Sequence, residues 1–311
     1  MLGKTAGGLY WMFRGLERAE NNARLIEAGF RIALTRSTNT ATEWKSVIVT
    51  SAAQQGFTAK HTEFNSTNVI DYLLRDTDNP SSVLSVVKQA RDNARMVRTA
   101  LTTEVWSAVN ETWMLITELL KNPVPDTDLP EVLSIIRQQS ALVRGALHGT
   151  MLRNDIYDFC RLGTFIERMD STARIIDVKY YTLLPSLVGS RMDNVQWETL
   201  LRSVSAHRSY RWAVEDDYTA TNIANFLVLD RRMPRSLAFC AGQIVENLDY
   251  LSEEYSDRRP SHDMADRLAA RLKGRDIHSI IEEGLHAVLG TIISDVGALG
   301  AQIEKDYRFN Y

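Results

Sequence analysis

One pattern of residues occurs twice in this chain, and the two copies align at an offset of 150 positions. Residues 9–27 and 159–177 both contain Glu-Arg, then an acidic residue, then Ala-Arg followed by an aliphatic residue, Ile and another acid. The matching residues are Glu17, Arg18, Glu20, Ala23, Arg24, Ile26 and Glu27 in the first copy, and Glu167, Arg168, Asp170, Ala173, Arg174, Ile176 and Asp177 in the second. A repeat of this kind restricts the fold to one with two similar halves.

The similarity resumes downstream of both segments. Trp44 matches Trp197 at an offset of 153, and residues 64–73 match residues 218–227 at an offset of 154. Further matching pairs are Asp76 with Asp230, Pro80 with Pro234, and Ser82 with Ser236. Short insertions account for the change in offset, so we interpret the chain as a tandem duplication of one unit of about 150 residues. Two such units usually pack about a pseudo-two-fold axis, and we expect the shared residues near that axis or at equivalent positions.

Apolar residues recur at helical spacing along most of the chain. In the first copy Leu9, Phe13, Leu16 and Ile26 follow a period of about 3.6 residues. In the second copy the same period links Leu162, Phe165, Ile166, Met169, Ala173 and Ile176. Runs of alternating β-branched residues, which are typical of strands, do not occur in the sequence. The pattern predicts an all-α fold, a helical bundle of roughly ten to twelve helices built from two tandem pseudo-symmetric repeats.

Capping residues, prolines and glycines indicate where the helices begin and end. We expect helices over about 9–34, 43–56, 65–74, 82–97 and 130–148, a break at 38–40, a loop over 185–194, a helix beginning near 234 and a final helix over about 277–303. The final helix contains Gly284, Gly290, Gly297 and Gly300. Glycine costs about 1 kcal/mol against alanine in a helix, so these glycines predict close backbone packing.

The expected breaks also divide the chain. We assign residues 1–121 to a first helical repeat, 122–157 to a connecting loop and helix, and 158–311 to a second helical repeat. A chain of 311 residues is longer than one hydrophobic core usually serves. We expect the two repeats to form one globular unit.

Composition excludes several classes of protein. A net charge of −3 provides no general attraction to nucleic acid or to an anionic membrane. The two cysteines, Cys160 and Cys240, are too few for a disulfide framework, and we interpret Cys160 as a core residue. The N-terminus lacks the apolar segment of a signal peptide, and no stretch approaches the roughly 18 apolar residues of a membrane span. We therefore predict a cytoplasmic protein without nucleic-acid or membrane partners.

Acidic and basic residues follow one another at helical spacing in both copies of the pattern. Glu20 precedes Arg24 by four residues, and Asp170 precedes Arg174 by four. Such pairs stabilise an exposed helix by about 0.2–0.5 kcal/mol each. This local effect accounts for one helix, but it does not explain why the order of acid and base is repeated while neighbouring polar residues differ.

Glu17 and Glu167 have no basic residue four positions further along the chain, so we expect each to bind an arginine on a facing helix. Glu17, Glu20 and Arg24 share one helix face, and Arg18 points away from it. The candidate site residues are Glu17, Arg18, Glu20, Arg24, Glu167, Arg168, Asp170 and Arg174. Two interpretations stay open, a structural ion network between helices and a ligand-binding cleft. A buried network would need every charge to be paired.

A second candidate site lies where two expected helices begin, at residues 80–82 and 234–236. A helix N-terminus has unpaired N–H groups and attracts anions. The candidate anion-binding residues are Arg231, Arg232, Arg235 and Ser236. Ordinary capping of the helix by serine is the alternative interpretation.

Other chemical signatures are weak. A di-iron centre in a helical bundle needs Glu-x-x-His on two helices, and only Glu283 and His286 have this spacing, so we predict no metal site. Phosphate-binding glycine loops and the Gly-x-Ser-x-Gly elbow do not occur, and we predict no cofactor. Residues 206–211 place a tyrosine among cations, as in single-strand nucleic-acid sites, but the net acidity of the chain argues against that function.

Several of these segments also carry a family resemblance. The segments are 9–11, 17–24, 79–83, 90–95, 167–174, 226–227 and 234–236. They resemble the alpha-E family, bacterial all-helical proteins named for their Glu-Arg motif. The resemblance implies genes that neighbour circularly permuted ATP-grasp ligases and transglutaminase-like proteins, and hence a role in forming or processing amide or peptide bonds. It supplies no catalytic residues.

We therefore expect a helical accessory protein that binds an ATP-grasp-type ligase, a peptide or amino-acid ligand, or both. Homo-oligomers stay open. One alternative is an enzyme that uses Glu17 and Glu167 as acid and base, which requires both carboxylates to converge on a pocket connected to solvent. Arginines around both carboxylates in a dry interior would remove that alternative. Another alternative is a scaffold without a pocket.

Overall fold

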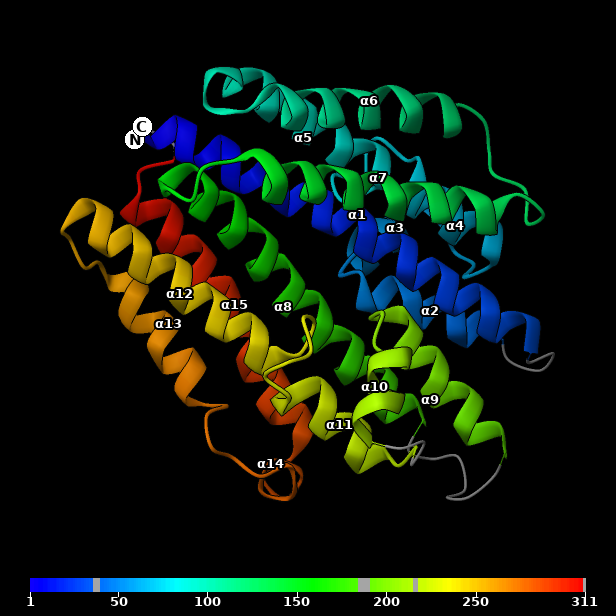
Figure 1. Ribbon diagram of the computed structural model, residues 1–311. Coiled ribbons are helices and arrows are strands. Elements are labelled where there is room, and N and C mark those ends of the chain that lie inside the picture. Colours follow the sequence, from blue (N-terminus) through cyan, green and yellow to red (C-terminus); the bar gives the residue numbers. More distant parts are fainter. Residues whose placement is uncertain (36–39, 184–190, 215–217, 310–311) are drawn as a thin grey trace.

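The computed structural model describes residues 1–35, 40–183, 191–214 and 218–309, and within these residues the fold is all-α (Figure 1). The prediction of an all-helical chain is confirmed. The described residues form fifteen α-helices, more than the predicted ten to twelve. The chain breaks between α2 and α3 and again between α14 and α15, where one helix each was expected. The two tandem repeats stay a prediction.

The helices of the first half are α1 (Gly3–Thr35), α2 (Thr40–Thr50), α3 (Gln54–Lys60), α4 (Ser66–Leu74), α5 (Val83–Met96), α6 (Thr103–Leu119) and α7 (Leu129–Thr150). A 3-10 turn, η1 (Arg98–Ala100), precedes α6. The helices of the second half are α8 (Asp155–Leu183), α9 (Arg191–Ser203), α10 (His207–Val214), α11 (Ala220–Leu229), α12 (Leu237–Tyr255), α13 (Pro260–Ala270), α14 (Ile277–Glu283) and α15 (Leu285–Asp306).

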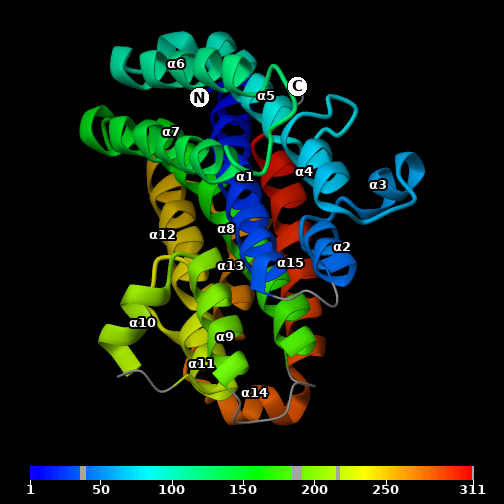
Figure 2. The same cartoon turned by 90° about the vertical axis from the view of Figure 1, so that its right-hand side faces the viewer.

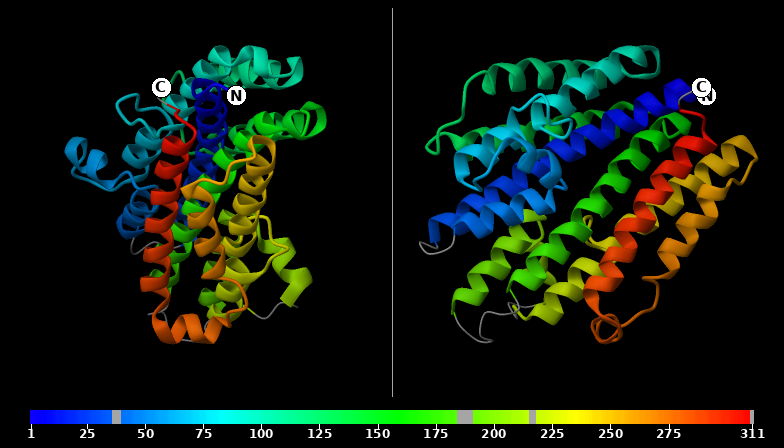
Figure 3. Two further views of the ribbon diagram at one scale, coloured as in Figure 1. Left: turned by 90° about the vertical axis from the view of Figure 1, so that its left-hand side faces the viewer. Right: turned by 180° about the vertical axis from the view of Figure 1, so that it is seen from behind.

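Helices α1 and α8 cross at the centre of the molecule and make the most extensive contact between any two helices (Figure 1). Helices α5 and α7 pack on α1, whereas α12 and α15 pack on α8. Figure 2 shows α5, α6 and α7 at one end of the molecule and α9, α10, α11 and α14 at the other. The two chain ends lie close together, as Figure 3 also shows, and Gly3 lies against the backbone of Arg308.

The central crossing is close because one helix presents a glycine to the other. A Cβ atom on Gly163 of α8 would lie 2.1 Å from the carbonyl oxygen of Tyr10 on α1. The aromatic side chains of Tyr10 and Phe13 on α1 and of Phe159 and Phe165 on α8 are fully buried. The buried apolar residues of both halves belong to one core cluster. The division into 1–121, 122–157 and 158–311 stays a prediction.

Polar side chains cap several helices at aligned positions of the two halves. Asn65 accepts a hydrogen bond from the backbone N–H of Asn68 at the start of α4 (2.9 Å), and Thr219 does the same for α11 (3.1 Å). Ser82 caps α5 (3.2 Å) and Ser236 caps α12 (3.0 Å) in the same way. Each cap satisfies a backbone N–H group that has no partner within its own helix.

Some predicted boundaries were wrong. Gly56 lies inside α3 and does not end a helix, because the chain already breaks between α2 and α3. Residues 191–194 belong to α9, and residues 185–190 of the expected loop lie outside the described residues, as do 38 and 39 of the expected break. The expected final helix is broken into α14 and α15 at Gly284, whose φ of 102° no α-helix accommodates.

The predicted close packing of glycines in the final helix holds at one position only. A Cβ atom on Gly300 would lie 3.2 Å from the hydroxyl of Tyr10. Open space lies beside Gly290 and Gly297, where a Cβ atom would have no neighbour within 4 Å. Among the described residues, α15 is also the one helix long and apolar enough to cross a membrane, and its buried face packs on α8 and α13 as a core helix does.

Candidate functional site

The two Glu-Arg motifs bind each other across the central helix crossing. Arg18 of α1 binds both oxygens of Glu167 on α8, with Nε–Oε1 and Nη2–Oε2 distances of 2.5 and 2.8 Å. Reciprocally, Arg168 of α8 binds both oxygens of Glu17 on α1, at 2.9 and 2.8 Å. Bidentate arginine–carboxylate pairs are among the strongest hydrogen-bonded contacts in proteins. The prediction that Glu17 and Glu167 bind arginines of a facing helix is confirmed.

Further arginines complete a buried ion network around these motifs. Arg235, which precedes α12, contacts Glu17 (2.9 Å) and Glu20 (2.8 Å). Arg144 of α7 also contacts both of these carboxylates. The remaining ion pairs join Arg24 to Glu20 (2.6 Å) and Arg14 to Glu167 (2.9 Å). Arg14 and Arg144 lie outside the repeated motif, so the sequence comparison missed them.

Burial and pairing act in opposite directions on these carboxylates. Glu17 and Glu20 are each 1 % exposed and Glu167 is 5 % exposed. Burial by itself would raise the pKa of Glu17, but Arg168 and Arg235 outweigh it and lower the pKa below its usual range. The pKa of Glu167 is lowered in the same way by Arg18 and Arg14 against the effect of burial. These groups are therefore ionised and held by protein partners, so the geometry does not support their use as acid and base.

Two predicted site residues lie apart from the buried network. Asp170 and Arg174 form an i,i+4 pair on α8 at 2.8 and 3.0 Å, and both side chains are partly exposed. The other six predicted residues, Glu17, Arg18, Glu20, Arg24, Glu167 and Arg168, are brought together. The interpretation as an ion network between helices describes this arrangement, and an open cleft does not.

The structure does not gather the four anion-binding candidates around one site. Arg235 is buried and also donates to Asn21 (2.9 Å), and Ser236 caps α12 and donates to the carbonyl of Asp230 (2.5 Å). Arg232 pairs with Asp230 at 2.8 Å. Arg231 lines a separate pocket beside α12. Because Arg235 and Ser236 already have protein partners, ordinary capping is the better interpretation of this helix start.

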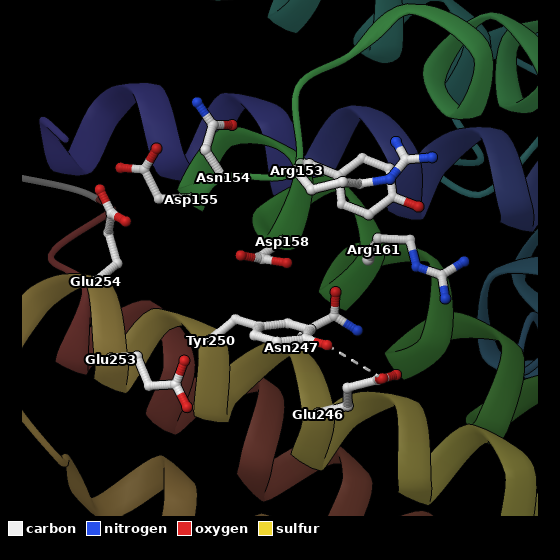
Figure 4. A pocket seen from close by; sticks show the side chains of 11 residues that line it. Arg153, Asn154, Asp155, Asp158, Arg161, Glu246, Asn247, Tyr250, Glu253 and Glu254 are labelled. Carbon is white, nitrogen blue, oxygen red and sulfur yellow. Dashed lines mark hydrogen bonds between the residues drawn. The ribbon is translucent and has the colours of Figure 1, made fainter.

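A pocket of about 680 Å³ lies between the start of α8 and the face of α12 (Figure 4). Two arginines line it, Arg153 and Arg161. Five carboxylates also line it, namely those of Asp155, Asp158, Glu246, Glu253 and Glu254. Figure 4 shows Arg153 and Arg161 at one end, with Glu246 on the same side. Asp155, Glu253 and Glu254 lie at the other end, and Asp158 lies between the two ends. One end of the pocket is therefore acidic, whereas the other end holds both arginines together with Glu246.

Asp158 differs from the carboxylates of the network because it has no partner. It is 5 % exposed, and its carboxylate has no hydrogen bond or ion pair to any residue that the structure describes. Burial, together with the nearby charge of Asp155, raises the pKa of Asp158 to about 7. The repeated pattern does not indicate Asp158, because the aligned residue of the first copy is Gly8.

The two arginines of the pocket bind neutral groups. Arg153 donates to the carbonyl of His148 (2.8 Å) and lies 4.0 Å above the ring of Tyr157. Arg161 donates to Gln243 and lies 4.4 Å from the ring of Phe165. Within the described ranges, neither guanidinium reaches a carboxylate at ion-pair distance. Both cations can therefore bind an external anion such as a carboxylate.

Other candidate groups take structural positions. Cys160 is buried, as predicted, and burial raises the pKa of its thiol. His286 pairs with Asp177 (2.5 Å), and in the part of the chain that the structure describes no three His, Cys, Asp or Glu side chains gather as metal ligands would.

A family model described as a predicted alpha-helical domain with a conserved ER motif matches residues 1–307. The chain belongs to the Alpha-E family. The reciprocal pairing of Glu17 with Arg168 and Glu167 with Arg18 gives that motif a structural role in this Alpha-E protein.

Two curated relatives are uncharacterized proteins, one from Mycobacterium bovis and one from Mycobacterium tuberculosis. Each is 23 % identical over 323 aligned positions, which cover 95 % of this chain and 35 % of the relative. The Alpha-E chain thus spans about a third of the length of the curated relatives it matches. No solved structure matches the chain.

Proposed function

We propose that this protein is a helical accessory or binding protein that acts with an ATP-grasp-type ligase in forming or processing amide or peptide bonds. Its ligand is an amino acid or peptide, held in the charged pocket between α8 and α12. The observation that carries the proposal is that both arginines lie at one end of the pocket, whereas Asp155, Glu253 and Glu254 lie at the other. An amino acid or peptide carries an ammonium and a carboxylate, and the pocket offers carboxylates for the first and arginines for the second.

The carboxylate end of the ligand can be tested separately. Arg161→Gln should lower the affinity for short peptides with a free C-terminus about tenfold, because a charge-assisted hydrogen bond contributes about 1.5–3 kcal/mol. The same peptides with an amidated C-terminus should bind the wild type and Arg161→Gln with equal affinity. Isothermal calorimetry measures both, and Arg95→Gln on the exposed side of α5 is the matched control. Equal losses for the acid and the amide would contradict the proposed role of Arg161.

The ATP-grasp-type ligase is proposed as the partner from the family resemblance and from the greater length of the mycobacterial relatives. About two thirds of each mycobacterial relative lies outside the matched part, which leaves room for a fused partner in those proteins. We expect this protein to co-purify with the ATP-grasp-type ligase encoded beside its gene, more strongly with ATP than without. Failure to co-purify under both conditions would count against the partnership and leave the ligand test unaffected.

The proposal also covers the origin of the two halves and the location of the protein. The first is that the halves arose by tandem duplication, which the reciprocal Glu-Arg pairs and the aligned caps Ser82 and Ser236 support. The second is a cytoplasmic location without nucleic-acid or membrane partners, which rests on composition.

The enzyme alternative rests on a different residue from the two that the sequence indicated. Glu17 and Glu167 are surrounded by arginines, so they do not suit acid–base chemistry. Asp158 does, because a carboxyl group with a pKa of about 7 in a pocket can accept and donate a proton near neutral pH. Hydrolysis of peptide amides that is lost in Asp158→Asn would favour this alternative. A scaffold would show neither ligand binding nor turnover.

A further inference from the structure

A second cavity continues the charged pocket on the other side of α12. It lies between α12 and α13 and also measures about 680 Å³. Glu246, Tyr250 and Glu253 line both cavities, and Tyr250 is half exposed between them. The two cavities together therefore offer room for a ligand longer than one amino acid.

The lining of the two cavities is mainly acidic. Asp249 and Asp266 of the second cavity add to the five carboxylates of the first, against the cations Arg153, Arg161, Arg231 and Lys273. Asp249 and Asp266 both pair with Arg258. The carboxylates of Glu253 and Glu254, like that of Asp158, have no hydrogen bond or ion pair to any residue that the structure describes. The unpaired negative charge is thus concentrated in the first cavity.

Asp158 is the observation that points to a ligand. A buried carboxylate without a partner is costly, and an ammonium group brought into the pocket would supply the missing hydrogen bonds and charge. Its oxygens face the cavity in Figure 4. We propose that this pocket is a binding site for a primary alkylammonium group, anchored by Asp158, with the rest of the ligand running over Tyr250 towards the second cavity. This proposal rests on the proposed ligand-binding function and specifies the amine end of the ligand.

Binding should depend on pH through Asp158. The groups that act on its titration are Asp155, Cys160 and Arg161 on α8, Glu246, Tyr250 and Glu254 on α12, and Tyr307 after α15. At pH 6 most Asp158 carboxyls are protonated, because their pKa is about 7. The side-chain amines of lysine stay charged from pH 6 to 8, so a change in affinity that Asp158→Asn abolishes reports the titration of Asp158. The affinity should rise about tenfold over this range, with release of a proton on binding.

The experiment compares two sources of the same ammonium chemistry. Tetralysine represents a peptide and 1,5-diaminopentane represents a free oligoamine, and fully N-acetylated tetralysine is the control probe. Isothermal calorimetry at pH 6 and 8 measures binding to the wild type, to Asp158→Asn and to Glu111→Gln. Glu111→Gln is the control, because it removes one negative charge on the exposed face of α6.

We expect Asp158→Asn to lose at least tenfold in affinity at pH 8. Glu111→Gln should stay within twofold of wild type, and the acetylated probe should bind weakly. Tighter binding of tetralysine than of the diamine would assign the site to peptides, and the reverse to free oligoamines.

Three results would overturn the proposal. They are no binding of either amine, equal affinities for wild type and Asp158→Asn, and an affinity that does not change with pH. A second variant, Glu253→Gln with Glu254→Gln, keeps the test valid if Asp158→Asn fails to fold, and it too should weaken amine binding. If carboxyl-ended peptides still respond to Arg161→Gln while amines do not respond to Asp158→Asn, the amine anchor is wrong and the proposed function stands.

Discussion

Two buried carboxylates of similar exposure behave in opposite ways, because their partners differ. Glu17 contacts Arg144, Arg168 and Arg235, and its pKa is lowered in spite of burial. Asp158 has no such partner among the described residues, and burial raises its pKa to about 7. The first carboxylate contributes stability as long as it is ionised, whereas the second lowers stability when it ionises.

Asp158→Asn should therefore stabilise the protein at alkaline pH. The pKa of Asp158 is raised from 3.8 to about 7, so the stability it contributes is complete below pH 3.8 and is lost as pH rises through 7. Asparagine does not ionise, so the variant does not lose this stability. The free energy of unfolding of Asp158→Asn relative to wild type should therefore be about 2 kcal/mol higher at pH 8 than at pH 5. Urea unfolding at the two pH values measures it. An equal stabilisation at pH 5 and at pH 8 would show that Asp158 does not titrate between these pH values.

Glu17→Gln and Glu167→Gln should each lower the free energy of unfolding by about 3 kcal/mol, because each removes a buried carboxylate that binds at least two arginines. The exposed pair Lys88–Asp92 provides the control, and Asp92→Asn should cost less than about 1 kcal/mol. Chemical denaturation measures all three. Peptide binding by the folded fraction should not change, and a loss of binding with full stability would make the network a candidate ligand site again.

At the scale of elements, the crossing of α1 and α8 determines how the two motifs meet. The helices approach so closely at Gly163 that no side chain fits between them. The aligned residue of the first copy is Phe13, so this close approach is not a shared feature of the two copies. The crossing places Arg18 against Glu167 and Arg168 against Glu17.

Gly163→Ala should destabilise the protein by about 3 kcal/mol, because the added methyl group would force the two backbones apart. Gly145 on the exposed side of α7 is the matched control, since nothing lies within 4 Å of its Cβ position. Gly145→Ala should stabilise the protein by about 0.5–1 kcal/mol through helix propensity. Thermal and urea unfolding of both variants tests the contrast. Equal effects would mean that the α1–α8 crossing adapts to a side chain.

At the scale of the whole molecule, the ion network joins parts of the chain that are far apart in sequence. It links α1, α7, α8 and the residue that precedes α12. Each half supplies cations to the carboxylates of the other, since Glu17 takes Arg168 and Glu167 takes Arg18. Neither half has a complete network by itself.

Fragments 1–152 and 153–311, separated between α7 and α8, should therefore not fold alone. Each would expose the apolar and charged surface of the crossing, and Glu17 or Glu167 would lose its arginine from the other half. Co-expression of the two fragments should restore a complex that unfolds cooperatively. Circular dichroism with thermal unfolding measures this. A fragment 1–152 that unfolds cooperatively alone would show that the first half is an independent unit.

The sequence by itself determined that this protein is helical and that its Glu-Arg residues pair. Helical periodicity and i,i+4 spacing are local properties, so they can be read from neighbouring residues. It also indicated correctly that Glu17 and Glu167 need arginines from another helix, because each lacks a local partner. Helix ends such as Gly56 and the break at Gly284 were misplaced, because breaks depend on how the flanking helices pack.

Only the tertiary structure decided which carboxylates are satisfied and which are not. Arg144 and Arg235 reach Glu17 and Glu20 across more than a hundred residues of chain, and no local spacing predicts such contacts. Asp158 became a candidate in the same way, because the solvation and partners of a carboxylate depend on the helices that fold around it.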